Sequence, residues 1–130
     1  MGKGINEWSE EIGQWGREKG WDKPALCETK ARDLDSMGSA EPQGVDVNAV
    51  GMKLALVHSE VSEALEAVRD GKYVAYEKDG KPEGMVVELA DTVIRIFHLC
   101  DLLGLDLEDA VERKMAANQK RPYRHGGRLA

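Results

Sequence analysis

Apolar residues recur at three- and four-residue intervals in four stretches of the chain. This period places them on one side of a helix, whereas a strand would alternate apolar and polar residues, and no such alternation stands out. The intervals predict core helices at about 5–19, 48–70, 82–103 and 106–120. A chain of 130 residues suits one domain, so we expect a single all-α domain over 1–130, a bundle of four to five helices.

Capping residues mark the ends of the two central helices. Asp46 or Asn48 is expected to cap the second helix, and Gly71 to follow its last turn. Pro82 suits the first turn of the third helix, where its missing N–H costs nothing, and Gly104 is expected to end that helix. Local signals therefore predict these boundaries independently of the apolar pattern.

The connections between the helices differ in length. Residues 22–47 hold prolines, glycines and scattered charges, with a helical turn or two expected at ALCETKARDLDSM. A connection this long is uncommon in a small domain and is often functional, for instance as a lid. Asp79-Gly80 predicts a turn before the third helix. Asp106 and Asp109 resemble a capping box that begins the last helix.

Charged residues interrupt the apolar faces of the two central helices. In the second helix Glu60 falls inside the apolar arc and Glu63 at its edge, whereas Glu66 falls on the solvent side. The third helix is apolar nearly all round, which is typical of a buried helix. A polar stripe on a buried helix must face a cavity, a partner charge or a metal. This stripe consists of Glu88, Asp91, Arg95 and His98.

Together the two helices carry two pairs of carboxylates. Glu60 and Glu63 are three residues apart, as are Glu88 and Asp91, so each pair shares one helix face. If the helices pack antiparallel, four carboxylates meet, which is costly unless a cation compensates them. Hard oxygen ligands suit Mg²⁺, with Mn²⁺ as the second choice. The pattern predicts a metal site made of all four carboxylates, which are also the candidate catalytic residues.

Two other interpretations fit a cluster of carboxylates. In a buried ion-pair network Arg95 would neutralise Asp91 or Glu88, although one arginine leaves excess negative charge. A di-iron bundle would need a Glu-x-x-His motif on two helices, whereas positions 63 and 91 are Glu and Asp. The divalent-cation site is therefore favoured over both.

The distribution of charge restricts the partners. The net charge of −6 disfavours a general nucleic-acid binder, and no stable nucleic-acid partner is expected. Residues 113–128 are nonetheless basic, as is the tail 121–130, and salt-sensitive DNA binding through them stays an alternative. The sequence has no apolar run of bilayer length and no apolar N-terminal signal region, so no membrane partner is expected. Cys27 and Cys100 are expected to be reduced, which favours the cytoplasm.

The last helix offers side chains suited to phosphate. Lys114, Asn118 and Arg121 share one face of it. The two cations can neutralise phosphate oxygens, and the amide can hydrogen-bond a sugar or base edge. Because Mg²⁺ is usually bound together with substrate phosphates, the carboxylates favour this interpretation over a plain solvated face. Trp15, as a stacking surface, and His98 complete the candidate substrate-binding residues, although a tryptophan at such a position more often belongs to the core.

At this spacing the carboxylate pairs match a known family. Glu60-x-x-Glu63, followed after twenty-four residues by Glu88-x-x-Asp91, resembles the all-α nucleoside triphosphate pyrophosphohydrolases, the MazG-like group of the dimeric dUTPase superfamily. KMAANQKRPYRHGG is similar to the end of MazG-like members, and the resemblance covers residues 48–127.

The resemblance implies Mg²⁺-dependent hydrolysis of an NTP or dNTP to a nucleoside monophosphate and pyrophosphate, in nucleotide-pool control or housecleaning. It implies that the four carboxylates hold the metal, with one of them as a general base on water. It also implies self-association, as a homodimer or homotetramer. A non-catalytic nucleotide-sensing or helical regulatory module stays an alternative, and the base preference does not follow from the sequence.

Overall fold

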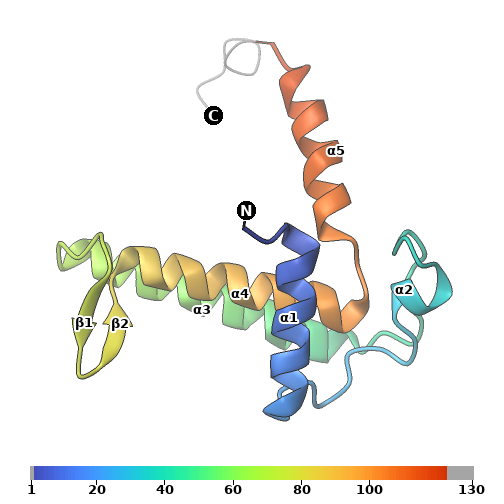
Figure 1. Ribbon diagram of the computed structural model, residues 1–130, viewed down its shortest axis with the longest axis horizontal. Coiled ribbons are helices and arrows are strands. Elements are labelled where there is room, and N and C mark those ends of the chain that lie inside the picture. Colours follow the sequence, from blue (N-terminus) through green and yellow to red (C-terminus); the bar gives the residue numbers. More distant parts are fainter. Residues whose placement is uncertain (1, 123–130) are drawn as a thin grey trace.

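The computed structural model describes residues 2–122 and is mostly helical (Figure 1). Its elements are α1 (Ile5–Glu18), α2 (Ala31–Leu34), α3 (Val47–Arg69), β1 (Tyr76–Lys78), β2 (Lys81–Glu83), α4 (Met85–Leu103) and α5 (Leu107–Gln119). The expected helical class is confirmed. The helices expected at 5–19, 48–70 and 106–120 are α1, α3 and α5, and each boundary agrees to within one residue.

Two further findings concern the part of the chain that the structure describes. Residues 123–130, which make up most of the expected basic tail, lie outside it. Within residues 2–122, no helix combines the length and the apolar character needed to cross a membrane.

α3 and α4 lie side by side as a long antiparallel pair, joined by a β-hairpin at one end (Figure 1). Asp79 and Gly80 form the turn of the hairpin with φ of 53° and 77°, the left-handed values that tight hairpins need. The expected turn is therefore confirmed. The prediction that a helix begins at Pro82 was wrong, because Pro82 lies in β2 and α4 begins at Met85. Proline is tolerated in a two-stranded hairpin because both strands are edge strands.

Helix capping follows the local signals. The Asp46 carboxylate accepts a hydrogen bond from the Ala49 N–H at the start of α3, at 3.1 Å. At the start of α5 the Asp106 carboxylate accepts from the Asp109 N–H, at 3.0 Å. Gly104 ends α4 in the left-handed conformation. These boundaries were predicted correctly because each depends on one or two neighbouring residues.

α1 crosses α4 at a contact made by two glycines (Figure 1). A Cβ on Gly13 would collide with the carboxylate of Asp101, and a Cβ on Gly16 would stand 2.6 Å from Nε2 of His98. The two glycines are three residues apart and share one face of α1. They therefore allow two polar side chains of α4 to lie directly against the α1 backbone.

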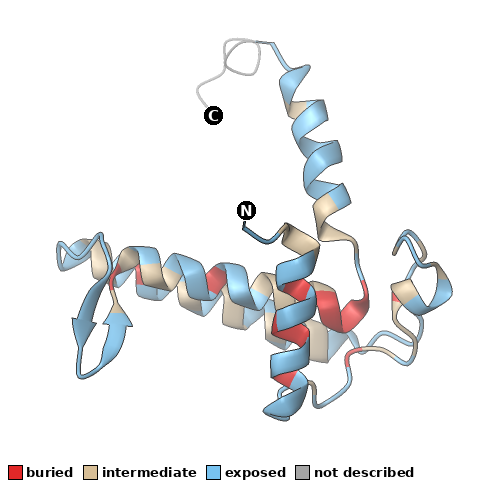
Figure 2. Ribbon diagram, viewed as in Figure 1, coloured by how far each residue is buried: buried red, intermediate tan, exposed pale blue. Residues whose placement is uncertain are grey.

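The core is small and lies where α1, the 22–46 connection and the end of α4 meet (Figure 2). Leu26 of the connection packs with Leu102 and Leu103 of α4, and Leu99 is partly buried against them. The helical turn expected in the connection is confirmed as α2. This contact anchors the connection to the same end of α4 that α1 crosses.

Much apolar surface remains exposed in the single chain. Val86, Leu89 and Val93 of α4 are 42–48% exposed, so the burial expected for a helix that is apolar nearly all round is not observed in one chain. Trp8 and Trp15 are similarly exposed, so the core position typical of a tryptophan like Trp15 is not observed. α5 has no buried residue between Leu107 and Gln119 and extends away from the α3–α4 pair (Figure 1).

Candidate functional site

Three carboxylates meet where the middle of α3 lies beside α4. One oxygen from each of Glu60, Glu88 and Asp91 lies within 4.8 Å of the others. The apolar side of α3 carries Glu60 into this contact, where its side chain is only 15% exposed. Glu63 is exposed and lies outside the group of three. The structure therefore brings together three of the four carboxylates that the sequence singled out.

Mutual repulsion and burial change the proton affinity of these carboxylates. Burial, followed by the charges of Asp91, Glu60 and Glu63, raises the pKa of Glu88. Burial and the charge of Glu60 also raise the pKa of Asp91, against an opposing effect of Arg95. Groups that repel each other in this way gain stability from a bound proton or a bound cation. The cluster is thus electrostatically suited to a positive ligand.

Arg95 compensates only part of this charge. Its Nε donates to Oε1 of Glu60 at 2.9 Å. In the ion-pair interpretation the arginine would have neutralised Asp91 or Glu88, but its partner is Glu60. One guanidinium facing three carboxylates leaves excess negative charge, which adds to burial in raising the pKa values of Glu88 and Asp91.

A pocket of about 230 Å³ opens beside the three carboxylates, between α1 and α4. The rings of Trp15 and Trp21 meet edge to face on its wall, with centroids 4.5 Å apart and planes at 87°. An aromatic wall next to a charged cluster suits a ligand that has a flat apolar part and a charged part. The pocket is lined by Ile12, Trp15, Trp21, Glu60, Asp91, Ile94, Arg95 and His98.

His98 lines this pocket and has a hydrogen-bonding atom without a partner. Its Nε2 is buried and has no hydrogen-bond partner among residues 2–122. Burial lowers the pKa of His98 below its ordinary 6.5, and the positive charge of Lys53 acts in the same direction. Both effects favour the neutral imidazole, which has one ring nitrogen without a partner.

The single chain does not bring the last helix to the carboxylates. Lys114, which is exposed, and Asn118, which is half-buried, lie on α5, and the exposed Arg121 follows its end. This helix extends away from α3 and α4 (Figure 1). The first turn of α5 is held against α1, where Nδ2 of Asn6 donates to Oδ1 of Asp106 at 2.7 Å. The expected phosphate-binding residues and the carboxylates thus stay apart within one chain.

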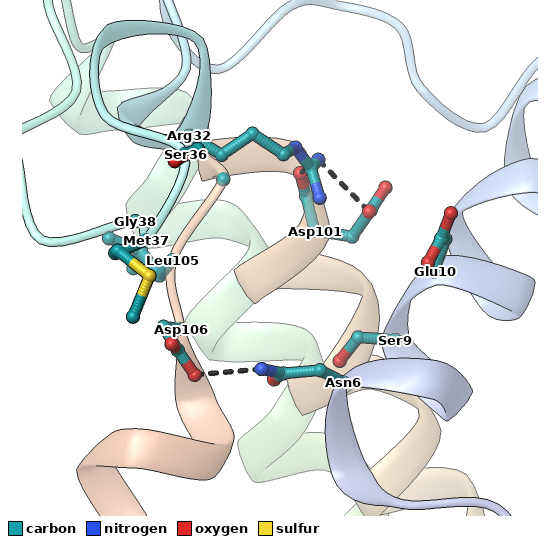
Figure 3. Close-up of a pocket in the computed structure, with 11 residues that line it drawn as sticks. Asn6, Ser9, Glu10, Arg32, Ser36, Met37, Gly38, Asp101, Leu105 and Asp106 are labelled. Carbon is teal, nitrogen blue, oxygen red and sulfur yellow. Dashed lines mark hydrogen bonds and ion pairs between the residues drawn. The ribbon is translucent and has the colours of Figure 1, made fainter.

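A smaller polar pocket, of about 130 Å³, lies between α1, the connection and the end of α4 (Figure 3). The Asp101 side chain, only 2% exposed, accepts from Arg32 at 3.0 Å and from Arg17 at 3.4 Å. Arg32 also donates to the Asp101 carbonyl at 2.6 Å. These bonds join three segments that are distant in sequence. They hold α1 and the connection in place around α4, and with them the tryptophans of the larger pocket.

Sequence reasoning missed three residues near the carboxylates. Lys53 of α3 and Lys23 of the connection line a pocket next to the aromatic one. Lys53 precedes Glu60 by seven residues and therefore shares its helix face, a spacing that was available in the sequence. Trp21 and Lys23 follow the end of α1, where no helical period indicates which way a side chain points.

Comparisons with profiles of known protein families, with curated proteins and with solved structures find no match. The basis for assigning a function is therefore the arrangement of side chains described above, together with the spacing of the carboxylate pairs.

Proposed function

We propose that the protein is a Mg²⁺-dependent nucleoside triphosphate pyrophosphohydrolase of the MazG-like type, which converts an NTP or dNTP to the monophosphate and pyrophosphate. One observation carries the proposal: Glu60, Glu88 and Asp91 converge from two helices beside a pocket with an aromatic wall. Nucleotide-pool control in the cytoplasm is the setting that this reaction fits.

The donor set fits a hard divalent cation. The three groups are carboxylates, with no sulfur or imidazole ligand among them, which suits Mg²⁺ or Mn²⁺ better than zinc or iron. Glu60, Glu88 and Asp91 would hold the ion. When bound, such an ion orients a triphosphate, offsets negative charge in the transition state and lowers the pKa of a bound water.

Glu63 suits the role of general base. It is exposed and lies outside the group of three, yet its charge contributes to the raised pKa of Glu88. In the proposed reaction a water oxygen bonds to the α-phosphorus while the bond from that phosphorus to the bridging oxygen breaks. Pyrophosphate leaves with the electron pair, and Glu63 accepts the proton of the water.

The aromatic pocket would hold the nucleobase. Trp15 and Trp21 supply flat apolar surface, and base stacking on aromatic side chains is favourable for every base. His98 lines the same pocket and contributes to its shape, since its imidazole packs against Gly16 of α1. The base would then lie between α1 and α4, with the phosphates directed toward Glu60 and Asp91.

Self-association would complete the site. Exposed apolar residues recur at helical spacing on α3 and α4, a pattern suited to packing against a second copy. In a homodimer or homotetramer, α5 of one subunit would bring Lys114, Asn118 and Arg121 to the phosphates bound by another. The exposed apolar residues are Leu54, Val61, Leu65, Val86, Leu89 and Val93.

A panel of canonical and modified NTPs and dNTPs, assayed for pyrophosphate with and without Mg²⁺, tests the proposal. The expected result is metal-dependent release of equal amounts of pyrophosphate and monophosphate. The preferred nucleotide would then define the role in the nucleotide pool. Nucleotide binding by folded protein without any release would instead favour the non-catalytic sensing module.

A further inference from the structure

A second pocket, of about 360 Å³, lies next to the aromatic one and is lined by cations. Lys23 comes from the connection, Lys53 from α3 and Arg95 from α4, so three separate segments place positive charge around one space. Gly20, Trp21 and His98 complete the lining. Because the three cations come from separate segments, their proximity is not explained by the solvent-exposed face of a single helix.

Neither lysine has a carboxylate partner among residues 2–122. The only hydrogen bond that the Lys53 side chain makes there joins its Nζ to the Trp21 carbonyl, at 3.4 Å, and the Lys23 side chain makes none. The third cation, Arg95, forms an ion pair with Glu60 at 2.9 Å. The charges of Asp101 and Asp22 both act on His98, but neither residue lines the pocket. The pocket therefore holds positive charge that its own walls do not neutralise.

The cationic pocket adjoins the carboxylates. Trp21, Arg95 and His98 line both it and the aromatic pocket, and Arg95 also bonds Glu60. A ligand held at the carboxylates can thus extend past Arg95 toward Lys53 and Lys23. The charge along that path changes from negative, at the candidate metal site, to positive.

We propose that Lys23, Lys53 and Arg95 bind the two terminal phosphates of the nucleotide and hold the pyrophosphate that is released. The inference rests on the proposed function for the identity of the ligand. A lysine ammonium is a point charge for phosphate oxygens, and a guanidinium can donate two parallel hydrogen bonds. With the terminal phosphates held there, the α-phosphate lies beside Glu60 and Asp91, which accounts for cleavage between the α- and β-phosphates.

The test is calorimetric titration of the full chain with inorganic pyrophosphate in EDTA, so that binding does not depend on a metal. Lys53→Gln and Lys23→Gln are expected to weaken binding about tenfold each, because each removes one charge-assisted contact. Lys78→Gln, on the exposed hairpin strand β1, is the matched control and should bind like the wild type. Circular dichroism melting curves establish that each variant is folded.

The outcomes separate this inference from the proposed function. Absence of pyrophosphate binding by the wild type, or unchanged binding by both lysine variants, overturns the pocket assignment even if nucleotides are hydrolysed. Pyrophosphate binding that depends on Lys53, in a protein that hydrolyses no nucleotide, supports the pocket and rejects the hydrolase. Equal or tighter Lys53-dependent binding of a short single-stranded DNA would overturn the assignment in favour of a phosphodiester ligand.

Discussion

Nε2 of His98 lies 2.6 Å from the point where a Cβ on Gly16 would stand, so α1 and α4 meet where a histidine packs against a glycine. The same imidazole lines both pockets beside the carboxylates. The packing of α1 on α4 and the shape of the candidate nucleotide site are therefore coupled through one side chain.

Gly16→Ala should displace His98 and separate α1 from α4. Overpacking of a close helix contact costs about 1–3 kcal/mol, and the free energy of unfolding measured by urea titration should fall by that amount. Gly51→Ala is the control, because Gly51 lies within α3 with nothing near its Cβ position. This control should stabilise the protein by up to about 1 kcal/mol. Equal stability of the two variants would contradict the close contact.

Stability should depend on pH through His98. Burial lowers the pKa of His98 in the folded protein below 6.5, so between that lowered pKa and 6.5 the unfolded chain binds more protons. Stability therefore rises with pH across this window and is lost as the pH falls from 6.5. His98→Gln should flatten the dependence of the unfolding free energy on pH in this range.

The matched control for the pH experiment is His58→Gln. His58 is exposed on α3 and should leave the wild-type slope in place. The same slope in all three proteins would show that His98 is not the group responsible.

The carboxylate cluster was predictable because one helical period governs it. Glu60, Glu88 and Asp91 each interrupt an apolar helix face. Antiparallel packing of the two helices then brings their carboxylates together. Of the four predicted carboxylates, Glu63 was placed only at the edge of the apolar arc, and in the structure it is exposed. The cationic pocket was not predicted, since Lys23 lies in a connection whose path depends on tertiary contacts such as the Arg32–Asp101 bonds.

Asp101→Asn should loosen the connection and α1 together. The carboxylate is buried and accepts from two arginines that are themselves partly exposed, so the arginines can rehydrate when it is neutralised. A loss of about 1–3 kcal/mol in the free energy of unfolding is expected. Arg113→Gln, which removes an exposed ion pair with Asp109, should change stability by less than about 1 kcal/mol. Similar losses in both variants would refute the anchoring role of Asp101.

Leu89→Glu should abolish self-association. Leu89 lies in the exposed apolar row of α4, and a charge there opposes burial against a second copy. Sedimentation is expected to give an oligomer for the wild type and a monomer for Leu89→Glu. Val74→Glu, at a 75% exposed position before the hairpin, should keep the wild-type mass. A monomeric wild type at micromolar concentration would contradict the proposed self-association.

The hairpin was missed because its strands are too short to show an alternating pattern. β1 and β2 have three residues each, and the Pro82 that suggested a helix start lies in β2. The Asp79-Gly80 turn was still predicted correctly, since its positive φ values depend only on those two residues. The exposure of α4 was also missed. Its apolar sequence indicates that the helix is buried, but not whether the same chain or a second copy buries it.

The most direct test of the central claim is pyrophosphate release in Mg²⁺ by Glu88→Gln compared with Glu66→Gln. Glu88 belongs to the carboxylate cluster, whereas Glu66 lies on the exposed side of α3 and pairs only with Arg69 at 2.9 Å among the described residues. Glu88→Gln should stay folded and lose more than about 100-fold in turnover, because a ligand to the metal is lost. Glu66→Gln should keep wild-type turnover. Full activity in Glu88→Gln would contradict a metal-dependent hydrolase built on these carboxylates.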